Sequence, residues 1–332
     1  ITYGDWSSDV CSSDLFFNFL RIKGSESKFM NKKLIAVAVA STFAIPAISQ
    51  ADSTWYGRVN TGISIVDADS AASTSADIKN ISSRFGVKGS TDLGNGLSAV
   101  YRYEFGVASD VADVQDNNRL SFVGLSGSFG TVTMGRVWSA LFNHVGTNVD
   151  LSQNVGGDSY WRAGGTYRTS NTLSYAHGTG NVNFQIDMEL DGSNAASSTT
   201  DSWAAAGTFK AGAASIALGY RDVKDDHEYT GISAKIGLGA VNMHVGYSTQ
   251  DDGSADNTTG VALGVSGGSG DISWWAMAED VSDDDAGTDF SAINLNVLRN
   301  MGGGTKTYVE IQLDDNGGSD TNEIILGLRK DF

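Results

Sequence analysis

The feature that most constrains this chain is a strict alternation of apolar and polar residues that recurs in segment after segment. In residues 182–190, V-N-F-Q-I-D-M-E-L, five apolar side chains alternate with two amides and two acids. A period of two predicts a β-strand with one apolar and one polar face. About sixteen segments of this kind follow one another, and no long helical pattern separates them. The recurrence predicts a closed up-and-down barrel whose outer face meets lipid and whose inner face meets water.

The connections between these segments are of two alternating kinds. Short glycine-rich turns are expected at residues 92–96, 127–130, 177–180, 210–212, 237–239, 267–270 and 302–304. The other connections are longer and acidic, such as D-V-K-D-D-H-E, Q-D-D-G-S-A-D and E-D-V-S-D-D-D. Sixteen crossings of about 10 residues each, together with their turns and loops, account for the chain from residue 52 onward. The predicted fold is therefore all-β: a transmembrane antiparallel β-barrel of 16 strands with short periplasmic turns and long extracellular loops.

The first 51 residues do not follow this pattern. Asn31-Lys32-Lys33 and the apolar run over residues 34–48, followed by Ser49-Gln50-Ala51, are typical of a cleaved signal peptide. We therefore expect a signal peptide at residues 30–51 and a barrel at residues 52–332. Residues 1–29 contain Y-G-D-W-S-S-D-V-C-S-S-D-L, which looks like a translated sequencing adapter. We interpret them as non-native upstream translation.

The composition argues against nucleic acid as a partner and against disulfide cross-links in the barrel. The 332 residues carry a formal charge of -17. Residues 1–51 contain four acids and five bases, so residues 52–332 carry -18. Nucleic acid is not expected as a partner, because phosphate binding requires a basic surface. The single cysteine, Cys11, and the single proline, Pro46, both precede residue 52, so the barrel is expected to need no disulfide and to pair its backbone N–H groups freely.

The sequence contains short matches to catalytic and metal-binding motifs, but the flanking residues and the spacing do not fit such sites. Residues 264–268, G-V-S-G-G, match G-x-S-x-G, but a turn and a strand are expected after them where a nucleophile elbow needs a helix. The four histidines have no metal-ligand spacing, and Asp283-Asp284-Asp285 does not fit a calcium loop. The sequence therefore predicts no enzyme, no cofactor and no metal site.

Several motifs, in order along the whole of residues 52–332, resemble Gram-negative general diffusion porins. W-Y-G-R, S-R-F-G-V-K-G and R-L-S-F-V-G-L match family positions, as does D-L-S-Q-N-V-G-G-D in a long segment from Ala140 to about Gly165. The resemblance implies that this third loop folds into the lumen, with its acids opposite basic residues of the wall. It assigns the pore constriction to Arg58, Arg84, Arg119, Arg162, Asp150 and Asn154. Asn154 stands where the family motif has a glutamate.

The resemblance further implies function, partners and location. We expect a water-filled channel for passive diffusion of ions and small hydrophilic solutes, exported to the outer membrane as a homotrimer. Outer-membrane lipid, lipopolysaccharide and the barrel assembly machinery are the other expected partners. Phe332 ends an alternating strand and resembles the terminal assembly signal of outer-membrane barrels.

Two alternatives make different demands on the barrel. A substrate-selective oligosaccharide porin needs aromatic side chains along the lumen, for which Trp161 and an inward-facing Trp275 are the candidates. An outer-membrane lipid hydrolase needs a serine and histidine pair on the outer face, and Ser266 adjoins a short turn where no such site is expected.

Overall fold

The structure, a computed structural model, describes residues 52–69, 74–111, 113–154, 156–192, 199–253, 257–283, 289–317 and 320–332. The chain divides into two units, residues 1–47 and 48–332. The predicted upstream segment 1–29 and signal peptide 30–51 lie outside the described residues. The account that follows concerns the second unit.

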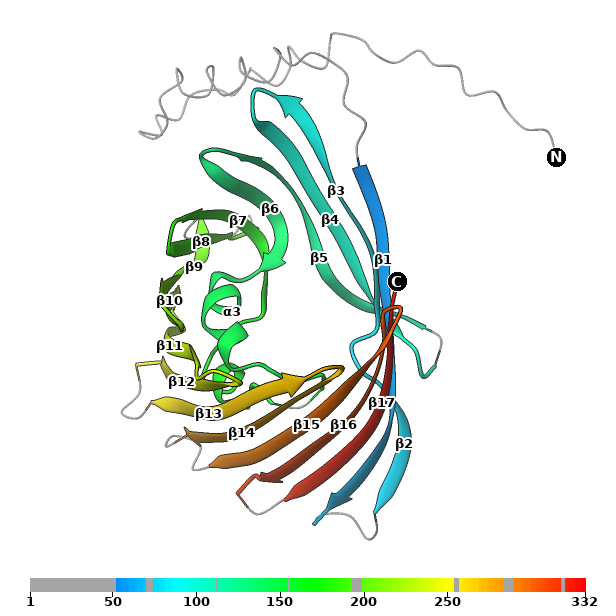
Figure 1. Cartoon of the computed structure of the whole chain (residues 1–332). Helices are drawn as coiled ribbons and strands as arrows, with labels where there is room; N and C mark the ends of the chain where they lie inside the picture. The colour runs from blue at the N-terminus through cyan, green and yellow to red at the C-terminus, as the bar shows by residue number, and fades with distance from the viewer. Residues whose placement is uncertain are drawn as a thin grey trace, which may run out of the picture. The chain divides into compact units, whose positions relative to one another are not determined.

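This unit is one antiparallel sheet that closes on itself, because the first strand pairs with the last (Figure 1). The strands of its first half are β1 (Asp52–Ala68), β2 (Ser75–Asn80), β3 (Arg84–Gly94), β4 (Leu97–Ala108), β5 (Asp113–Gly127), β6 (Gly130–Trp138), β7 (Arg168–Thr179) and β8 (Val182–Leu190). Those of the second half are β9 (Thr200–Ala211), β10 (Ala214–Val223), β11 (His227–Gly237), β12 (Val241–Asp251), β13 (Thr258–Ser269), β14 (Ile272–Asp283), β15 (Phe290–Gly302), β16 (Thr305–Asp315) and β17 (Thr321–Asp331).

The prediction of sixteen strands is confirmed, because β2 and β3 are two halves of one interrupted barrel strand. Both pair with β1: β3 along residues 52–58 and β2 along residues 61–66. The interruption falls at residues 81–83, where Ser82 has a positive φ of 55°. β1 continues to Ala68 and β2 begins at Ser75, so the connection between them is short.

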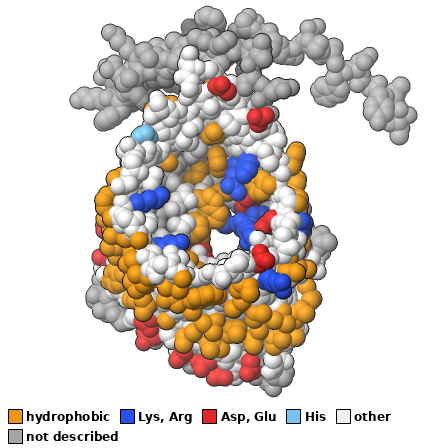
Figure 2. Space-filling model, viewed as in Figure 1, with side chains coloured by type: hydrophobic (Ala, Val, Ile, Leu, Met, Phe, Trp, Pro, Cys, Tyr) orange, Lys and Arg blue, Asp and Glu red, His pale blue; other side chains and the backbone are white. Residues whose placement is uncertain are grey.

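The distribution of side chains is the reverse of that in a water-soluble sandwich. Large apolar residues such as Ile186 and Leu263 are exposed on the outside, whereas Gln185 and Asp187 are buried on the inside. Figure 2 shows the apolar residues as a belt around the barrel, with basic side chains in the central hollow. In β8, whose alternation is the most regular, Val182, Ile186 and Met188 face outward as predicted. Such a belt is what a hydrocarbon environment requires.

Several tight turns begin two or three residues later than predicted. The strands run through Thr179, Ala211 and Ser269, so that Gly180, Gly212 and Gly270 begin the turns. Each of these glycines has a φ of 57–58°, and a two-residue hairpin turn that follows the sheet's twist requires such a positive value. Gly267 belongs to β13 instead, where its missing side chain makes room for the indole of Trp274.

The three described helical segments all lie in the loop between β6 and β7: α3 (Ala140–His144), η2 (Gly146–Asn148) and α4 (Asp158–Trp161). This segment, residues 139–167, is called loop 3 below, and it agrees within two residues with the predicted one. No helix in the described part of the chain is both long and apolar enough to cross a bilayer.

Candidate functional site

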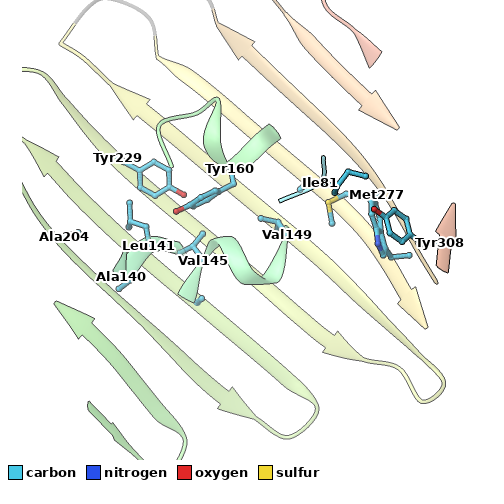
Figure 3. Packing of buried hydrophobic residues seen from close by; sticks show 14 of the residues in the cluster. Ile81, Ala140, Leu141, Val145, Val149, Tyr160, Ala204, Tyr229, Met277 and Tyr308 are labelled. Atoms are coloured by element: carbon cyan, nitrogen blue, oxygen red, sulfur yellow. The ribbon is translucent and has the colours of Figure 1, made fainter. Parts of the chain in front are cut away.

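Loop 3 packs inside the barrel, against the inner faces of β8 to β14 and β16, as predicted. Leu141 and Val145 of its first half meet β10 at Gly219, and Val149 meets β12 at Gly246 (Figure 3). A β-carbon at Gly219 would lie 2.8 Å from Leu141 Cδ2. The neighbouring strand β9 carries the small inward residues Ala204 and Ala206, and β13 carries Ala262. Small inward residues therefore create the space that the loop fills.

Carboxylates of the barrel wall bind the loop's backbone N–H groups. Asp187 accepts from the Ala140 N–H at 2.6 Å. Glu310 accepts from the N–H groups of Gln153 and Asn154 at 2.9 and 3.0 Å. These backbone groups have no partner within the loop, so a buried acceptor is needed to compensate for their lost water.

Glu279 of β14 makes the densest of these contacts. It accepts from the N–H groups of Gly157 and Ser159 at 3.0 and 3.1 Å and from the Ser159 hydroxyl at 2.8 Å. Asn294 donates a further hydrogen bond to it at 2.8 Å. Asp187, Glu279 and Glu310 are thus occupied by the loop.

Basic side chains dominate the opposite wall, formed by β17, β1 and β3 to β7. Glu104 is fully buried and contacts three arginines: Arg119 at 2.6 Å, Arg102 at 2.7 Å and Arg84 at 3.8 Å. Tyr56 also donates to Glu104, at 2.8 Å. One carboxylate shared by three guanidinium groups leaves this cluster with a net positive charge.

A second basic cluster closes the seam between β1 and β17. Asp331 pairs with Arg58 at 3.0 Å, Arg329 at 2.8 Å and Lys306 at 3.6 Å. Arg329 also donates from Nη1 to the Gln153 side chain of loop 3 at 2.8 Å. This cluster therefore links the basic wall to the tip of the loop.

A cavity of about 500 Å³ lies between loop 3 and the basic wall. Five of the six predicted constriction residues line it: Arg58, Arg84, Arg119, Asp150 and Asn154. Arg162 does not line it. That side chain pairs within the loop with Asp158 at 3.1 Å and lies over the ring of Phe290 at 3.9 Å.

The sequence reasoning missed Arg168 and Arg329, which line the same cavity. The arginine after the loop that reaches the cavity is Arg168, the first residue of β7. It stands in the sequence T-Y-R-T-S-N, residues 166–171, directly after the long segment. The ring of Trp138, at the end of β6, was also missed, and it too lines the cavity. Trp138 ends β6 and Arg168 begins β7, so their place at the cavity follows from where these two strands meet the loop.

Asp150 is the loop's acid at this cavity. Burial raises the pKa of its carboxyl group to about 6, although hydrogen bonds from Ser152 and Tyr167 oppose the shift. Burial likewise raises the pKa of the Tyr167 hydroxyl, so that this group stays protonated. Asp150 is therefore an acid whose charge changes just below neutral pH.

The side chains needed for the two alternative functions are placed differently. Trp275 faces inward as predicted, but it is only 8% exposed and belongs to the packed cluster. Trp161 is 53% exposed and does not line the cavity. Ser266 does contact His244 Nε2, at 2.9 Å, but the pair faces the lumen, and β13 is bound on both sides at Ser266. No group of histidines, cysteines and acids in the described part of the chain is placed to hold a metal ion.

Comparisons with known proteins agree on one family. The family described as Gram-negative porin matches residues 36–319. Major outer membrane protein P.IB of Neisseria gonorrhoeae is 39% identical over 128 residues, which cover 36% of each chain. The corresponding protein of Neisseria lactamica is 33% identical over 128 residues, covering 36% of this chain and 37% of that protein. These matches thus span about a third of the length of the curated relatives.

Solved structures match over a larger part of the fold. An anion-selective porin from Comamonas acidovorans has a TM-score of 0.73 at 20% identity, covering 85% of this chain and all of that one. The trimer form of OmpT from Vibrio cholerae has a TM-score of 0.69 at 14% identity, covering 85% of this chain and 99% of that one. At such identities the likeness concerns the fold alone.

Proposed function

This chain belongs to the Gram-negative porin family of the outer membrane, and we propose that it forms a water-filled channel for passive diffusion of ions and small hydrophilic solutes. We propose further that the cavity between loop 3 and the basic wall is its constriction. Loop 3 limits the size of the solute, and the charges that face it order water and favour polar over apolar solutes. Diffusion of this kind needs no catalytic group, and we propose no enzymatic activity.

The observation that carries the proposal is the charge imbalance across this cavity. Five arginines line it: Arg58, Arg84, Arg119, Arg168 and Arg329. The acids beside them are Asp150 from the loop and Glu104 and Asp331 from the wall. Asn154, where the family motif has a glutamate, adds no charge. The constriction itself should therefore favour anions.

The loop end of the barrel carries charge of the opposite sign. Asp225, Asp226, Asp251, Asp280 and Asp315 are exposed there, and acidic side chains gather below the apolar belt in Figure 2. We expect these acids to attract cations toward the pore at low ionic strength. The Debye length is about 30 Å at 0.01 M salt and about 3 Å at 1 M, so only the charges of the constriction itself, in which arginines outnumber acids, act on the ion at high salt.

Reversal potentials across a KCl gradient in planar bilayers test the proposal. At low mean concentration the pore should prefer cations, and this preference should fade or invert as the concentration rises. A selectivity that does not move with ionic strength would exclude a contribution from the loop acids. A purified, folded barrel that conducts no ions would overturn the proposed function itself.

We also propose that Phe332 is the assembly signal and that the barrel is a homotrimer. The ring of Phe332 lies over Gly57, and the two residues exchange backbone hydrogen bonds of 2.9 and 3.1 Å that complete the β1–β17 seam. The trimer form of the Vibrio protein supports the oligomeric state. Lipid, lipopolysaccharide and the assembly machinery are the further partners that we propose. Deleting Phe332 should reduce barrel yield in cells far more than it changes the conductance of assembled barrels, and a normal yield would refute the signal.

The mature protein, we propose, begins at Asp52, after a signal peptide at residues 30–51, and residues 1–29 are upstream translation. In support, Asp52 is the first residue of β1 and pairs with Ser90 of β3. Mass analysis of the exported protein should give Asp52 as its first residue. Retention of residues 30–50 would contradict this.

A further inference from the structure

Arg168 differs from the other arginines of the cavity because no carboxylate holds it. Arg84 and Arg119 share Glu104, and Arg58 and Arg329 share Asp331. Among the residues whose side chains are described, Arg168 has no ion pair and no side-chain hydrogen bond, and its Nε is buried without a partner. Its charge is therefore the least compensated of the five.

The indole of Trp138 holds this guanidinium instead. Trp138 and Arg168 are directly opposite one another in the β6–β7 pairing. Arg168 Cζ lies 4.2 Å from the centre of the indole, a cation–π contact, and Arg119 Cζ lies 6.0 Å from it. A planar guanidinium stacks well on an aromatic face, and a tryptophan offers the strongest such contact.

Trp138 is itself fixed by the loop. Its ring stacks on Phe142 of α3 at 4.7 Å, with 26° between the planes. Its backbone carbonyl accepts a hydrogen bond from Gln185 Nε2 at 3.0 Å. Both Trp138 and Phe142 line the cavity, so the indole is a rigid platform between the loop and the basic wall.

The other charged groups around Arg168 are Arg119, Arg136 and Glu104. The two arginines repel it, and Glu104 attracts it. Without the indole, no other described side-chain contact would hold the Arg168 guanidinium in the cavity against the repulsion of the two arginines. Its charge would then leave the path of the permeating ion.

We propose that Trp138 is a positioning residue for ion selectivity: it holds the uncompensated Arg168 guanidinium in the cavity by stacking, so that an uncharged side chain sets the anion preference of the constriction. This inference rests on the proposed function. It predicts that selectivity changes on a substitution that alters no charge.

The test compares four variants in planar bilayers at 1 M mean KCl, where screening isolates the constriction. Arg168→Gln removes the charge, and the anion-to-cation permeability ratio should fall by about threefold. Trp138→Leu keeps every charge but should lower the ratio by about twofold. Trp161→Leu is the matched control, because this tryptophan lies outside the cavity, and its ratio should equal that of the wild type. The double variant Trp138→Leu/Arg168→Gln should equal Arg168→Gln, since Trp138 acts only through Arg168.

A purely steric role for the indole predicts another result. In that case Trp138→Leu would raise the unitary conductance and leave the permeability ratio unchanged, which would overturn the inference. An unchanged ratio in Arg168→Gln would overturn it as well. A wild-type protein that conducts no ions would instead refute the proposed function.

Arg168→Lys provides a second test if Trp138→Leu does not fold. Lysine keeps the charge but lacks the planar guanidinium, so the ratio should fall between those of the wild type and Arg168→Gln. Trp138→Phe retains an aromatic face and should stay close to the wild type. A wild-type ratio in Arg168→Lys would show that stacking is irrelevant.

Discussion

The two halves of the barrel wall use the same alternating pattern for opposite purposes. On β8 to β16 the inward positions include small residues such as Ala204 and Gly219 and buried acids such as Glu279, against which loop 3 packs. On β17, β1 and β3 to β7 the inward positions include long basic side chains, and five arginines face a cavity. The size of the inward side chain therefore decides which half receives the loop and which half faces water.

Acids on the two halves also differ in what they bind. Glu279 and Glu310 accept backbone N–H groups of the loop, whereas Glu104 and Asp331 bind arginines. The first pair fixes the position of the loop, and the second fixes the positions of charges. The predictions below disturb one of the two halves or the loop between them, and they run from the largest expected effect to the smallest.

Gly260→Val should cause the largest change. A β-carbon at Gly260 would overlap the carbonyl oxygen of Ser159, so the substitution should push α4 away from β13 toward the basic wall. Overpacking of this kind costs about 1–3 kcal/mol. Unitary conductance should fall, while Gly237→Ala should conduct normally because the nearest atom to its β-carbon lies 3.6 Å away. Wild-type conductance in Gly260→Val would show that α4 does not rest on β13.

The double variant Glu279→Gln/Glu310→Gln should loosen the tip of loop 3. Hydrogen bonds to charged groups contribute about 1.5–3 kcal/mol each, and glutamine keeps only one accepting oxygen. Hydrogen exchange at the amides of residues 153, 154, 157 and 159 should accelerate by at least about tenfold, the equivalent of about 1.4 kcal/mol. Glu323→Gln is the control, because Glu323 binds Lys79 and Ser64 rather than the loop. Equal acceleration in both variants would argue against local anchoring.

Arg119→Gln should shift the pore toward cations by about threefold in permeability ratio, because it removes a partly screened charge from the cavity. Arg162→Gln should have little effect at 1 M salt, since this side chain pairs with Asp158 outside the cavity. Reversal potentials at 1 M mean KCl compare the two. If Arg162→Gln has the larger effect, Arg162 belongs to the constriction as the family resemblance implies. The cavity lined by Arg119 is then not the constriction.

The smallest expected effect is a pH step from Asp150. The pKa of this carboxyl group is about 6, so the group is charged at pH 7.5 and neutral at pH 4.5. Lowering the pH removes a negative charge from the constriction and should raise the anion-to-cation ratio by about twofold. Asp150→Asn should have the high-anion ratio at both pH values. If the permeability ratio of Asp150→Asn changes with pH as much as that of the wild type, another group is responsible for the titration.

The sequence by itself determined the barrel, its strand count and the segment that folds inside. Alternation with a period of two places Val182 outside and Asp187 inside without knowledge of any contact, because successive side chains of a strand must face opposite ways. The family resemblance, rather than this rule, assigned Arg58, Arg84 and Arg119 to the constriction, and all three line the cavity. The predicted turns began one to three residues too early. Glycine and serine are compatible with both a strand and a turn, so the exact end of a strand is not evident from them.

Only the tertiary structure decided which inward residues meet. Arg162 and Arg168 are six residues apart, and both follow Asp150 and Asp158 of the loop. Only Arg168 reaches the cavity, because β7 begins at Arg168, whereas Arg162 caps the end of helix α4. Likewise, sequence cannot show that Glu279 binds residues 157 and 159, which lie about 120 positions earlier in the chain. Strand periodicity fixes the face of a residue, whereas its partners across the lumen depend on barrel closure and on the path of loop 3.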